Sequence, residues 1–410
     1  MDKISEWINR IVLKEKPKHS FSVDKIRSLF HFDFSDSLVI SVTGTNGKGT
    51  VVKLLEACFL AADYRVACFT SPHLHTPNER VRLNGQNIET QKLLNLLNKI
   101  EAMPESKTFG FFHYLAIAAF FYFQEAQPEV VILEVGIGGE KDIVNVIDAD
   151  IAVISSIGLD HCEILGDTLE RIGQQKAGLF RGNKIAIVSA QTPIDSIDAH
   201  AKKLGARLLK INRDFSMNEK CTKWQYENRV IEELSFSRSL HPDNVAAVLT
   251  VLAESTKLPV STSTIRSVLE NFVMPGRCTV LKDHGVTAIV DVAHNPQAVE
   301  YLASFVRSRK IIGPLVAVAS FKPTKDVLNI LNLMKPLIDK WYIFSHNSPW
   351  LLTRAALHEK LKSAGIQRIF CCDDLPKAYQ SAKMLVGNNG AVIVFGSFIV
   401  AGEILGSVKE

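Results

Sequence analysis

The feature that most constrains the fold is a strand-like apolar run that enters a glycine-rich turn. Leu38–Thr43 is followed by Gly44-Thr-Asn-Gly-Lys-Gly-Thr50, and a helix-like stretch begins at Val51. In a strand–loop–helix unit, glycines allow backbone N–H groups to close on phosphate oxygens, while the helix N-terminus and a lysine add positive potential. The alternative is a chance glycine-rich turn, but the flanking strand and helix patterns favour a nucleotide-binding loop.

This loop differs from the ordinary P-loop pattern, G-x-x-x-x-G-K-[ST], at two positions. Val42 stands where that pattern has its first glycine, and Gly49 stands where it has a hydroxyl residue, while the hydroxyl comes one position later. The predicted nucleotide-binding residues of the loop are Thr45, Asn46, Gly47, Lys48, Gly49 and Thr50.

Apolar runs of strand length alternate with amphipathic segments of helix length. Such alternation is typical of an α/β fold with a mainly parallel sheet. The expected strands are Leu38–Thr43, Arg65–Phe69, Val130–Glu134, Ile151–Ser155 and Lys184–Val188, and the expected helices are Val51–Ala62, Gln91–Ile100, His113–Gln124 and Ile197–Lys203. Residues 212–239 are more polar and alternate weakly, which predicts a small antiparallel insertion before helices at Asn244–Ser255 and Ile265–Phe272.

A break at Met274-Pro-Gly-Arg277 separates this series from a second α/β series. Its expected strands are Thr287–Asp291, Leu315–Ala319, Lys340–Phe344, Ile369–Cys372 and Ala391–Phe395, and its expected helices are Gln297–Val306, Val327–Leu337, Arg354–Lys362 and Leu375–Leu385. Because proline and glycine together interrupt regular structure, we place a domain boundary at about residue 274, which gives domains of 1–273 and 274–410.

Composition excludes several classes of partner. Lysine and arginine number 47 against 43 acidic residues, and a net charge of +4 is too small to favour nucleic acid or an anionic membrane as the main partner. The most apolar stretch, Phe111–Phe123, is shorter than the ~20 residues of a membrane-spanning helix, so a buried helix is expected. Seven cysteines without a C-x-x-C pair, and no evident signal peptide, indicate a reducing, cytoplasmic compartment.

Four clusters of polar residues follow predicted strands, where open α/β sheets place their ligands. The first is Thr70-Ser-Pro-His-Leu74 with Glu79-Arg-Val-Arg82. Ser71 could bind a cation or a phosphate, and Arg80 and Arg82 could clamp carboxylates or phosphate. The alternative is a proline-broken turn with solvated charges.

The second cluster begins at Glu134, at the end of an apolar strand, and continues through three glycines to Gly139. A carboxylate in that position is costly unless it is paired or binds a metal, so Glu134 is a Mg²⁺ ligand candidate. A strand end with a flexible turn is the alternative.

The third cluster contains His161, which could bind a second cation, and Lys176, which could face the phosphates. A structural histidine and a solvated lysine are the alternatives.

The fourth cluster combines Arg277 with Val290-Asp-Val-Ala-His-Asn-Pro296. Asp291 could hydrogen-bond ribose hydroxyls, and His294 and Arg277 could reach nucleotide phosphates from the second domain. For Asp291 the alternative is an ordinary helix N-cap.

In order and type, these motifs resemble the folate branch of the Mur-type ATP-dependent amide ligases across nearly the whole chain. The resemblance is carried by Gly-Thr-Asn-Gly-Lys-Gly-Thr50, Thr-Ser-Pro-His-Leu74, Glu-Arg-Val-Arg82, Leu-Glu-Val-Gly-Ile-Gly-Gly139, Leu-Asp-His161, Leu-Gly-Asp-Thr168, Lys-Ala-Gly178, Pro-Gly-Arg277, Asp-Val-Ala-His-Asn-Pro296 and Val-Phe-Gly-Ser-Phe398. It implies a P-loop-type, mainly parallel sheet domain followed by a smaller Rossmann-like α/β domain.

The resemblance also implies the cofactors. ATP would bind the glycine-rich loop, and Asn244, Arg277 and Asp291 would complete its site across the domain cleft. Ser71 and Glu134 would hold one Mg²⁺, and Glu134 with His161 a second; a monovalent cation such as K⁺ is a further candidate. A carbamylated lysine, an anion that can bind metal, would fall on Lys176.

The implied reaction joins L-glutamate to dihydropteroate, to a reduced folate, or to both. ATP would phosphorylate the acceptor carboxylate, and the α-amine of glutamate would attack the acyl phosphate. Partners would be small molecules, with no nucleic acid and no membrane, and the protein would be a monomer. Two alternatives stay open: the same chemistry on another acceptor, such as a cell-wall nucleotide precursor, and a non-catalytic nucleotide-binding module.

Several positions depart from the family pattern around the expected acceptor site. Glu140 replaces an arginine, Phe112-His113 replaces a Phe-Glu pair, and Gln175 replaces the acid before the lysine, while Phe21-Ser-Val-Asp-Lys25 and Thr324-Lys-Asp326 replace two further motifs. The expected acceptor-binding residues are Phe21, Ser22, Val23, Arg80, Arg82, Phe112, His113, Lys141 and Asp142.

Overall fold

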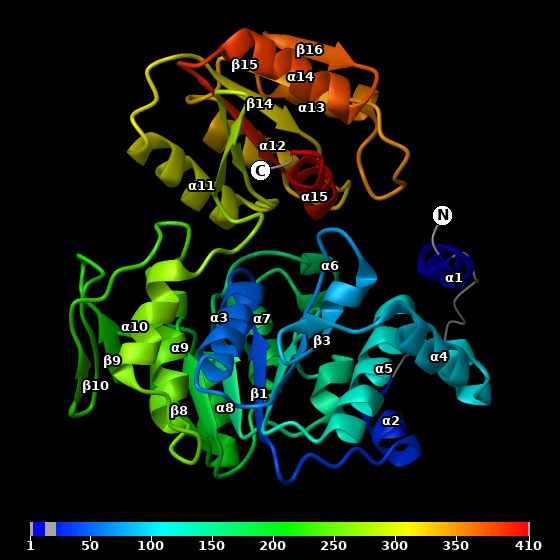
Figure 1. Ribbon diagram of the computed structural model, residues 1–410, viewed down its shortest axis with the longest axis vertical. Helices are drawn as coiled ribbons and strands as arrows, with labels where there is room; N and C mark the ends of the chain where they lie inside the picture. Colours follow the sequence, from blue (N-terminus) through cyan, green and yellow to red (C-terminus); the bar gives the residue numbers. More distant parts are fainter. Residues whose placement is uncertain (1–2, 13–21, 409–410) are drawn as a thin grey trace. The chain divides into compact units, whose positions relative to one another are not determined.

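The computed structural model describes residues 3–12 and 22–408, which fall in two compact units divided between Phe272 and Val273 (Figure 1). Phe21, an expected acceptor-binding residue, lies outside the described residues.

The first unit is built on an eight-stranded sheet in the order β4-β3-β2-β5-β1-β6-β7-β8. The six strands from β2 to β8 in that order are parallel, and β3 and β4 add an antiparallel edge. The strands are β1 Leu38–Thr43, β2 Val66–Phe69, β3 Val81–Leu83, β4 Gln86–Asn87, β5 Val130–Glu134, β6 Ile151–Ile154, β7 Ile185–Val188 and β8 Arg207–Lys210.

Helices cover both faces of this sheet (Figure 1). They are α1 Lys3–Val12, α2 Val23–Leu29, α3 Lys48–Leu60, α4 Thr90–Glu101, α5 Phe111–Ala126, α6 Cys162–Leu165, α7 Leu169–Ala177, α8 Asp195–Leu204, α9 Pro242–Glu254 and α10 Thr262–Asn271, with 3₁₀ turns η1 Pro77–Arg80, η2 Pro104–Thr108 and η3 Ile143–Val146.

Alternation of side chains along each strand divides the interior into two cores. On β5, Val131 and Leu133 pack in one core with α4, α5, α7 and α8, whereas Ile132 packs in the other with α3, α9 and α10. Both faces are buried, which explains why the parallel strands have continuous apolar sequences.

The polar segment 212–239 forms the small antiparallel sheet that its sequence predicted. Its strands are β9 Phe215–Met217, β10 Trp224–Tyr226 and β11 Arg229–Ile231, in the order β11-β10-β9. Trp224 and Tyr226 are buried in the core that contains α9.

The second unit has a six-stranded sheet in the order β12-β13-β17-β14-β15-β16, parallel except for the β12–β13 hairpin. The strands are β12 Thr279–Asp283, β13 Val286–Val290, β14 Leu315–Ala319, β15 Lys340–Phe344, β16 Ile369–Cys372 and β17 Ala391–Phe395. The helices are α11 Pro296–Ser308, α12 Val327–Met334, α13 Arg354–Ser363, α14 Leu375–Val386 and α15 Phe398–Ser407. The two sheet units confirm the predicted fold class.

Several predicted helix boundaries differ from the structure, and two of the differences have a clear physical cause. Helix α3 begins at Lys48, not Val51, because Gly47 in a left-handed conformation serves as its N-cap and the loop runs directly into the helix. Helix α12 ends at Met334, not Leu337, because Pro336 has no N–H to continue the hydrogen-bond ladder.

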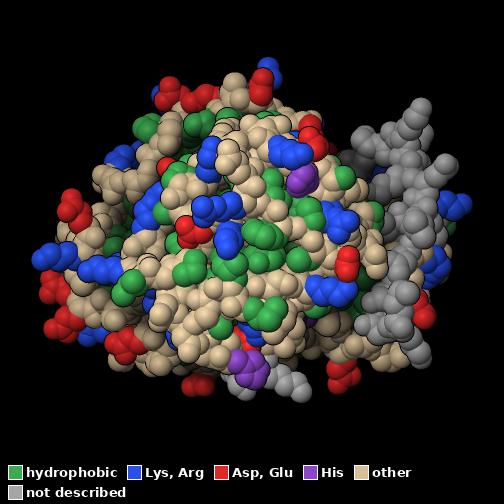
Figure 2. All heavy atoms as spheres, turned by 90° about the horizontal axis from the view of Figure 1, so that it is seen from above, with side chains coloured by type: hydrophobic (Ala, Val, Ile, Leu, Met, Phe, Trp, Pro, Cys, Tyr) green, Lys and Arg blue, Asp and Glu red, His purple; other side chains and the backbone are tan. Residues whose placement is uncertain are grey.

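Helix α5 is the buried helix predicted for the most apolar stretch, with Leu115 and Phe120 fully enclosed. Among the helices of residues 3–12 and 22–408, none has the length and apolar character that a membrane crossing requires. On the face shown in Figure 2, positive and negative side chains are interspersed around a central group of hydrophobic side chains, without a large area of one charge.

Candidate functional site

Strand order brings the predicted motifs of the first unit to one edge of its sheet. Strands β2, β5, β1 and β6 are adjacent and parallel, so the loops that follow them lie at the same carboxyl edge. These loops contain the glycine-rich turn, the Thr70–Leu74 segment, the Glu134–Gly139 segment and the approach to His161.

The glycine-rich loop requires glycine at two positions for steric reasons. Gly44 and Gly47 both have positive φ, 153° and 85°. A Cβ on Gly44 would collide with Ser155 Oγ, and one on Gly47 would lie 2.5 Å from the side-chain oxygen of Asn244. The structure thus places Asn244, a predicted ATP-site residue from α9, directly against the loop.

Hydrogen bonds hold the loop against the segment after β6. Thr45 N donates to Ser156 O and Asn46 N donates to Ser156 Oγ, each over 2.8 Å. Lys48 Nζ donates to Gly44 O over 2.9 Å, so the ammonium group lies over the loop. Thr50 lies buried in the first turn of α3.

Lys176 is a buried amine beside this loop. It is only 2% exposed, which excludes the solvated-lysine alternative. Burial, together with the like charge of Lys48, holds the pKa of Lys176 well below its ordinary value. A Cβ on Gly139 would lie 2.8–2.9 Å from the carbonyl oxygens of Gln175 and Lys176, so α7 and the Glu134–Gly139 segment touch through their backbones.

Glu134 is 3% exposed, and its Oε2 accepts a hydrogen bond of 2.9 Å from Ser71 N. The structure therefore brings the two residues of the predicted first Mg²⁺ site together. Among residues 3–12 and 22–408, no group of three His, Cys, Asp or Glu side chains could hold a metal by itself. Such a site still fits Mg²⁺, which usually binds one or two carboxylates together with substrate phosphates and water.

His161 adopts a left-handed conformation at the N-cap of α6, and its Nδ1 lies 3.7 Å from a carboxylate oxygen of Glu163. Its predicted pairing with Glu134 around a second cation stays a prediction.

The Thr70–Leu74 segment is ordered by one carboxylate. Glu79 accepts hydrogen bonds of 2.8 Å from the N–H groups of Leu74, His75 and Thr76. Burial opposes ionisation of Glu79, but these donors outweigh it and lower its pKa. The Thr76-x-x-Glu79 spacing is the capping-box pattern, so this residue could have been found from the sequence.

Arg80 is buried, at 9% exposure, with its guanidinium 5.3 Å from the centre of the Phe111 ring. Its Nε donates to His73 Nδ1 over 2.9 Å. Burial lowers the pKa of Arg80 to about 10 even though Glu134 and Glu79 favour its charged form. The alternative of a turn with solvated charges therefore fails for Arg80.

Arg82 is engaged within its own unit. Its Nε donates to Glu56 over 2.9 Å and its Nη2 to Gly85 O over 2.7 Å. Glu56 is buried on α3, so the pair has a structural role, and a part in substrate binding stays a prediction.

Asp142 organises the turn after β5. It caps η3 through Val144 N and accepts hydrogen bonds of 3.1 Å from the N–H groups of Gly136 and Ile137. Burial raises the pKa of Asp142 to about 6 in spite of these donors. Phe112 packs on Gly136, where a Cβ would lie 2.8 Å from the ring, whereas Lys141 is exposed.

Other predicted acceptor residues have local structural roles in the described part of the chain. His113 Nδ1 accepts from Gly110 N at the start of α5, and Ser22 caps α2, of which Val23 is the first residue. Glu140, which replaces an arginine of the family pattern, accepts a 3.2 Å hydrogen bond from Nε2 of Gln175, which replaces an acid. Asp326 caps α12.

In the second unit, three predicted residues gather after β13. Asp291 accepts hydrogen bonds of 2.6 Å from Cys278 N and Ala293 N, and burial raises its pKa although Arg277 opposes this. The helix N-cap is Asn295, so the N-cap alternative for Asp291 is wrong.

Phe398 lies between the other two predicted nucleotide contacts of this unit. The Arg277 guanidinium is 5.5 Å from the centre of the Phe398 ring, and the His294 ring is 6.0 Å from it. Phe398 ends the Val-Phe-Gly-Ser-Phe398 motif, and the sequence alone did not indicate its contact with these two residues. Approach of these residues to the glycine-rich loop stays a prediction.

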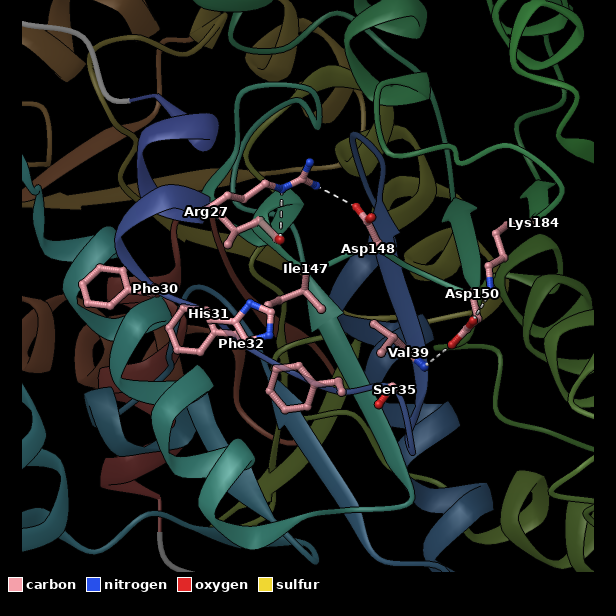
Figure 3. A pocket seen from close by; sticks show the side chains of 12 residues that line it. Arg27, Phe30, His31, Phe32, Ser35, Val39, Ile147, Asp148, Asp150 and Lys184 are labelled. Atoms are coloured by element: carbon pink, nitrogen blue, oxygen red, sulfur yellow. Dashed lines mark hydrogen bonds and ion pairs between the residues drawn. The ribbon is translucent and has the colours of Figure 1, made fainter.

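A pocket of about 550 Å³ lies at the opposite, amino-terminal edge of the first sheet (Figure 3). It is lined by Arg27, Phe30, His31, Phe32, Phe34, Ser35, Val39, Val146, Ile147, Asp148, Asp150 and Lys184. Its cations pair with its own carboxylates, Arg27 with Asp148 and Lys184 with Asp150, each over 2.6 Å. Both the arginine and the lysine among the described lining residues are therefore already paired, which does not favour phosphate binding in this pocket.

Models of two protein domains match the chain. The Mur ligase middle domain matches residues 42–252, and the Mur ligase, glutamate ligase domain matches residues 276–398. A dihydrofolate synthase/folylpolyglutamate synthase of Escherichia coli is 34% identical over 90% of this chain and 86% of its own length. The protein of that name from Buchnera aphidicola is 32% identical over 90% of this chain and 89% of its own length.

Solved structures resemble the whole fold. E. coli FolC in complex with DHPP and ADP has a TM-score of 0.89 at 30% identity and covers 98% of this chain and 97% of its own. A bifunctional folylpolyglutamate synthase/dihydrofolate synthase with Mn, AMPPNP and L-glutamate bound has a TM-score of 0.90 at 32% identity, with coverage of 98% and 97%.

Proposed function

Since the chain belongs to the Mur ligase family, we propose that it is an ATP-dependent amide ligase that joins L-glutamate to dihydropteroate, to reduced folates, or to both. The observation that carries this proposal is the joint placement of the glycine-rich loop and the Ser71–Glu134 pair at one sheet edge, in a chain that matches dihydrofolate synthase/folylpolyglutamate synthases over 90% of its length. E. coli FolC with DHPP and ADP supports the same nucleotide and acceptor class.

The carboxylate of the acceptor is a poor acyl donor and must be activated by ATP before it can react with an amine. An acceptor carboxylate resists attack by an amine because oxide would have to leave. Transfer of the γ-phosphoryl group breaks the bond to ADP and forms an acyl phosphate, and the α-amine of L-glutamate then displaces phosphate and loses a proton as the amide forms. Lys48 and the N–H groups at the start of α3 would stabilise the charge that develops on the transferred group, a role supported by the position of Lys48 at the first residue of that helix.

Metal binding belongs to the same step. Ser71 and Glu134 would hold Mg²⁺, with His161 at a second cation that Mg²⁺ or K⁺ could fill. Bound Mg²⁺ supplies charge neutralisation at the β- and γ-phosphates. The relative with Mn and AMPPNP bound supports a divalent metal.

Lys176 would act as a carbamate. Burial lowers the pKa of its amine and so favours the neutral form, which is the form that adds to CO₂ to give a carbamate and a proton. The product would be an anion beside Lys48, so the carbamate and the Lys48 ammonium would attract each other, and the carbamate could also bind metal.

The remaining predicted residues divide between nucleotide and acceptor. Asn244 would contact the nucleotide from α9, and Arg277, Asp291 and His294 from the second unit. The acceptor would meet the turn organised by Asp142, together with Phe21, Ser22, Val23, Arg80, Arg82, Phe112, His113 and Lys141. Seven unpaired cysteines support a reducing, cytoplasmic location, and we propose a monomer with small molecules as its partners.

The test is phosphate release with ATP, Mg²⁺ and L-glutamate, with dihydropteroate and tetrahydrofolate offered in separate reactions. Turnover with both supports a bifunctional enzyme, and turnover with tetrahydrofolate alone makes it a polyglutamylation enzyme. No turnover with either, from folded protein that binds ATP, overturns the proposal and favours a different carboxylate acceptor.

A further inference from the structure

A buried arginine in the site has outer nitrogens without hydrogen-bond partners. Among the described residues, the guanidinium of Arg80 makes one hydrogen bond, from Nε to His73 Nδ1. Nη1 and Nη2 carry four N–H donors that no described residue accepts. Because a buried guanidinium without acceptors is costly, this arrangement is typical of a site that an anion completes.

These nitrogens are not sealed inside the core. In the described part of the chain, the fully enclosed side-chain atoms without a partner are Ser41 Oγ, Trp224 Nε1 and Tyr379 Oη. The Nη groups of Arg80 are absent from that set, so they are not fully enclosed, in a side chain that is 9% exposed.

Arg82, two residues further along the chain, is a matched contrast. Its Nε donates to Glu56 over 2.9 Å, its Nη1 to Asn87 over 3.2 Å and its Nη2 to Gly85 O over 2.7 Å. All three nitrogens of Arg82 are used within the protein, whereas Arg80 uses only its Nε among the described residues.

His73 determines which side of the guanidinium is free. A histidine ring nitrogen that accepts from Arg80 Nε must carry a lone pair, so His73 is neutral with its proton on Nε2. With Nε occupied, a carboxylate cannot bind the Nε–Nη side. Only the end-on geometry remains, with one carboxylate oxygen on each Nη.

The rest of the environment fixes the guanidinium in this orientation. Its Cζ atom lies over the Phe111 ring, 5.3 Å from the ring centre, and Thr70 N donates to Arg80 O over 2.9 Å. Arg80 also interacts electrostatically with Glu134, which accepts a hydrogen bond from Ser71 N. An anion on the Nη groups would therefore lie close to the predicted metal site, where the reacting carboxylate must meet the γ-phosphate.

We propose that His73 is a positioning residue, which turns Arg80 end-on so that Nη1 and Nη2 form a two-pronged subsite for the acceptor's reacting carboxylate. This inference rests on the proposed function and assigns the substrate group that one part of the site binds.

The test compares His73→Asn with His73→Leu. Asn and Leu have the same branched shape, but only Asn Oδ1 offers an acceptor near the position of Nδ1. For His73→Leu we expect the KM of the acceptor to rise at least about tenfold, with the KM of ATP within about twofold of the wild-type value. His73→Asn should restore the acceptor KM to within about threefold.

His75→Leu is the matched control, because His75 is an exposed residue of the same segment, and it should leave both constants unchanged. Calorimetric binding of dihydropteroate, without turnover, gives a second measurement for each folded variant. An unchanged acceptor KM in His73→Leu, or equal damage in the Asn and Leu variants, overturns the inference while wild-type turnover leaves the proposed function intact. The opposite combination is also possible: the wild type binds dihydropteroate but shows no turnover, and the His73→Leu variant no longer binds dihydropteroate. That result would overturn the proposed function and leave the inference about His73 intact.

Discussion

Charged side chains at the two edges of the first sheet differ in burial and in pairing. At the carboxyl edge, Lys176, Arg80 and Asp142 are buried with displaced pKa values, and Arg80 has donors that the described residues leave unmatched. At the amino edge, the charges around the pocket of Figure 3 form ion pairs near water. Burying charge costs free energy, so the first arrangement persists only where a ligand uses it.

The largest effect should come from Lys48→Ala. Because Lys48 is the proposed donor to the transferred phosphoryl group, its removal should lower kcat by about 10²–10³-fold. Lys184→Ala, at the amino edge, is the matched control and should stay within about twofold, because Lys184 only pairs with Asp150. Steady-state phosphate release measures both, and equal effects would remove the distinction between the edges.

Lys176→Met should separate activity from stability. We expect a loss of kcat of about 100-fold, because the variant lacks the amine that the proposed carbamate requires. The pKa of Lys176 is lowered on folding, so the unfolded chain binds more protons and the unmodified amine destabilises the fold at pH 7. The variant should therefore melt higher, by about 2–4 °C for each kcal/mol regained.

Scanning calorimetry on protein freed of CO₂ provides the stability measurement for Lys176→Met. A lower melting temperature in the variant under those conditions would contradict the charge argument.

Asp142 should give the acceptor KM a pH dependence. With its pKa raised to about 6, its carboxyl is protonated below pH 6 and accepts less well from Gly136 N and Ile137 N. We expect the acceptor KM of the wild type to rise as pH falls from 7 to 5, by about tenfold per unit below the pKa. In Asp142→Asn the rise of the acceptor KM at low pH should disappear. Steady-state kinetics at several pH values, with ionic strength held constant, would test this.

The smallest effect should follow Arg27→Ala at the amino edge. Its ion pair with Asp148 is exposed, although Arg27 also donates to Asn145 O and Val146 O. We expect a loss of about 1 kcal/mol in stability and unchanged KM values for ATP and acceptor. A selective rise in the acceptor KM would show that the amino edge contributes to the site.

Strands were easier to predict from the sequence than the chain ends and short connections. Strands β1, β5 and β14 have the predicted bounds because both faces of each are buried and the whole segment is apolar. Helix α15 was missed because its sequence, FIVAGEILGS, is apolar on nearly all sides and has no clear 3.6-residue pattern. The β12–β13 hairpin was missed although Gly285 marks its turn.

In the site, the motifs predicted which residues gather but not how each is used. Ser71 and Glu134 meet because β2 and β5 are neighbours in the sheet, a strand order that the alternating sequence does not specify. Arg80 and Arg82 look equivalent in the sequence. Their difference arises from Glu56, 26 positions earlier on a different element, and from His73, so only tertiary structure could assign their roles.

Helix α3 connects the phosphate loop to the acceptor side. Lys48 begins this helix, and Glu56, eight residues and about 12 Å along it, accepts the hydrogen bond from Arg82. A displacement of α3 when phosphate binds at its N-terminus would therefore be transmitted to β3 and to neighbouring Arg80. ATP and the acceptor should bind with thermodynamic coupling, and by reciprocity each changes the affinity of the other by the same factor.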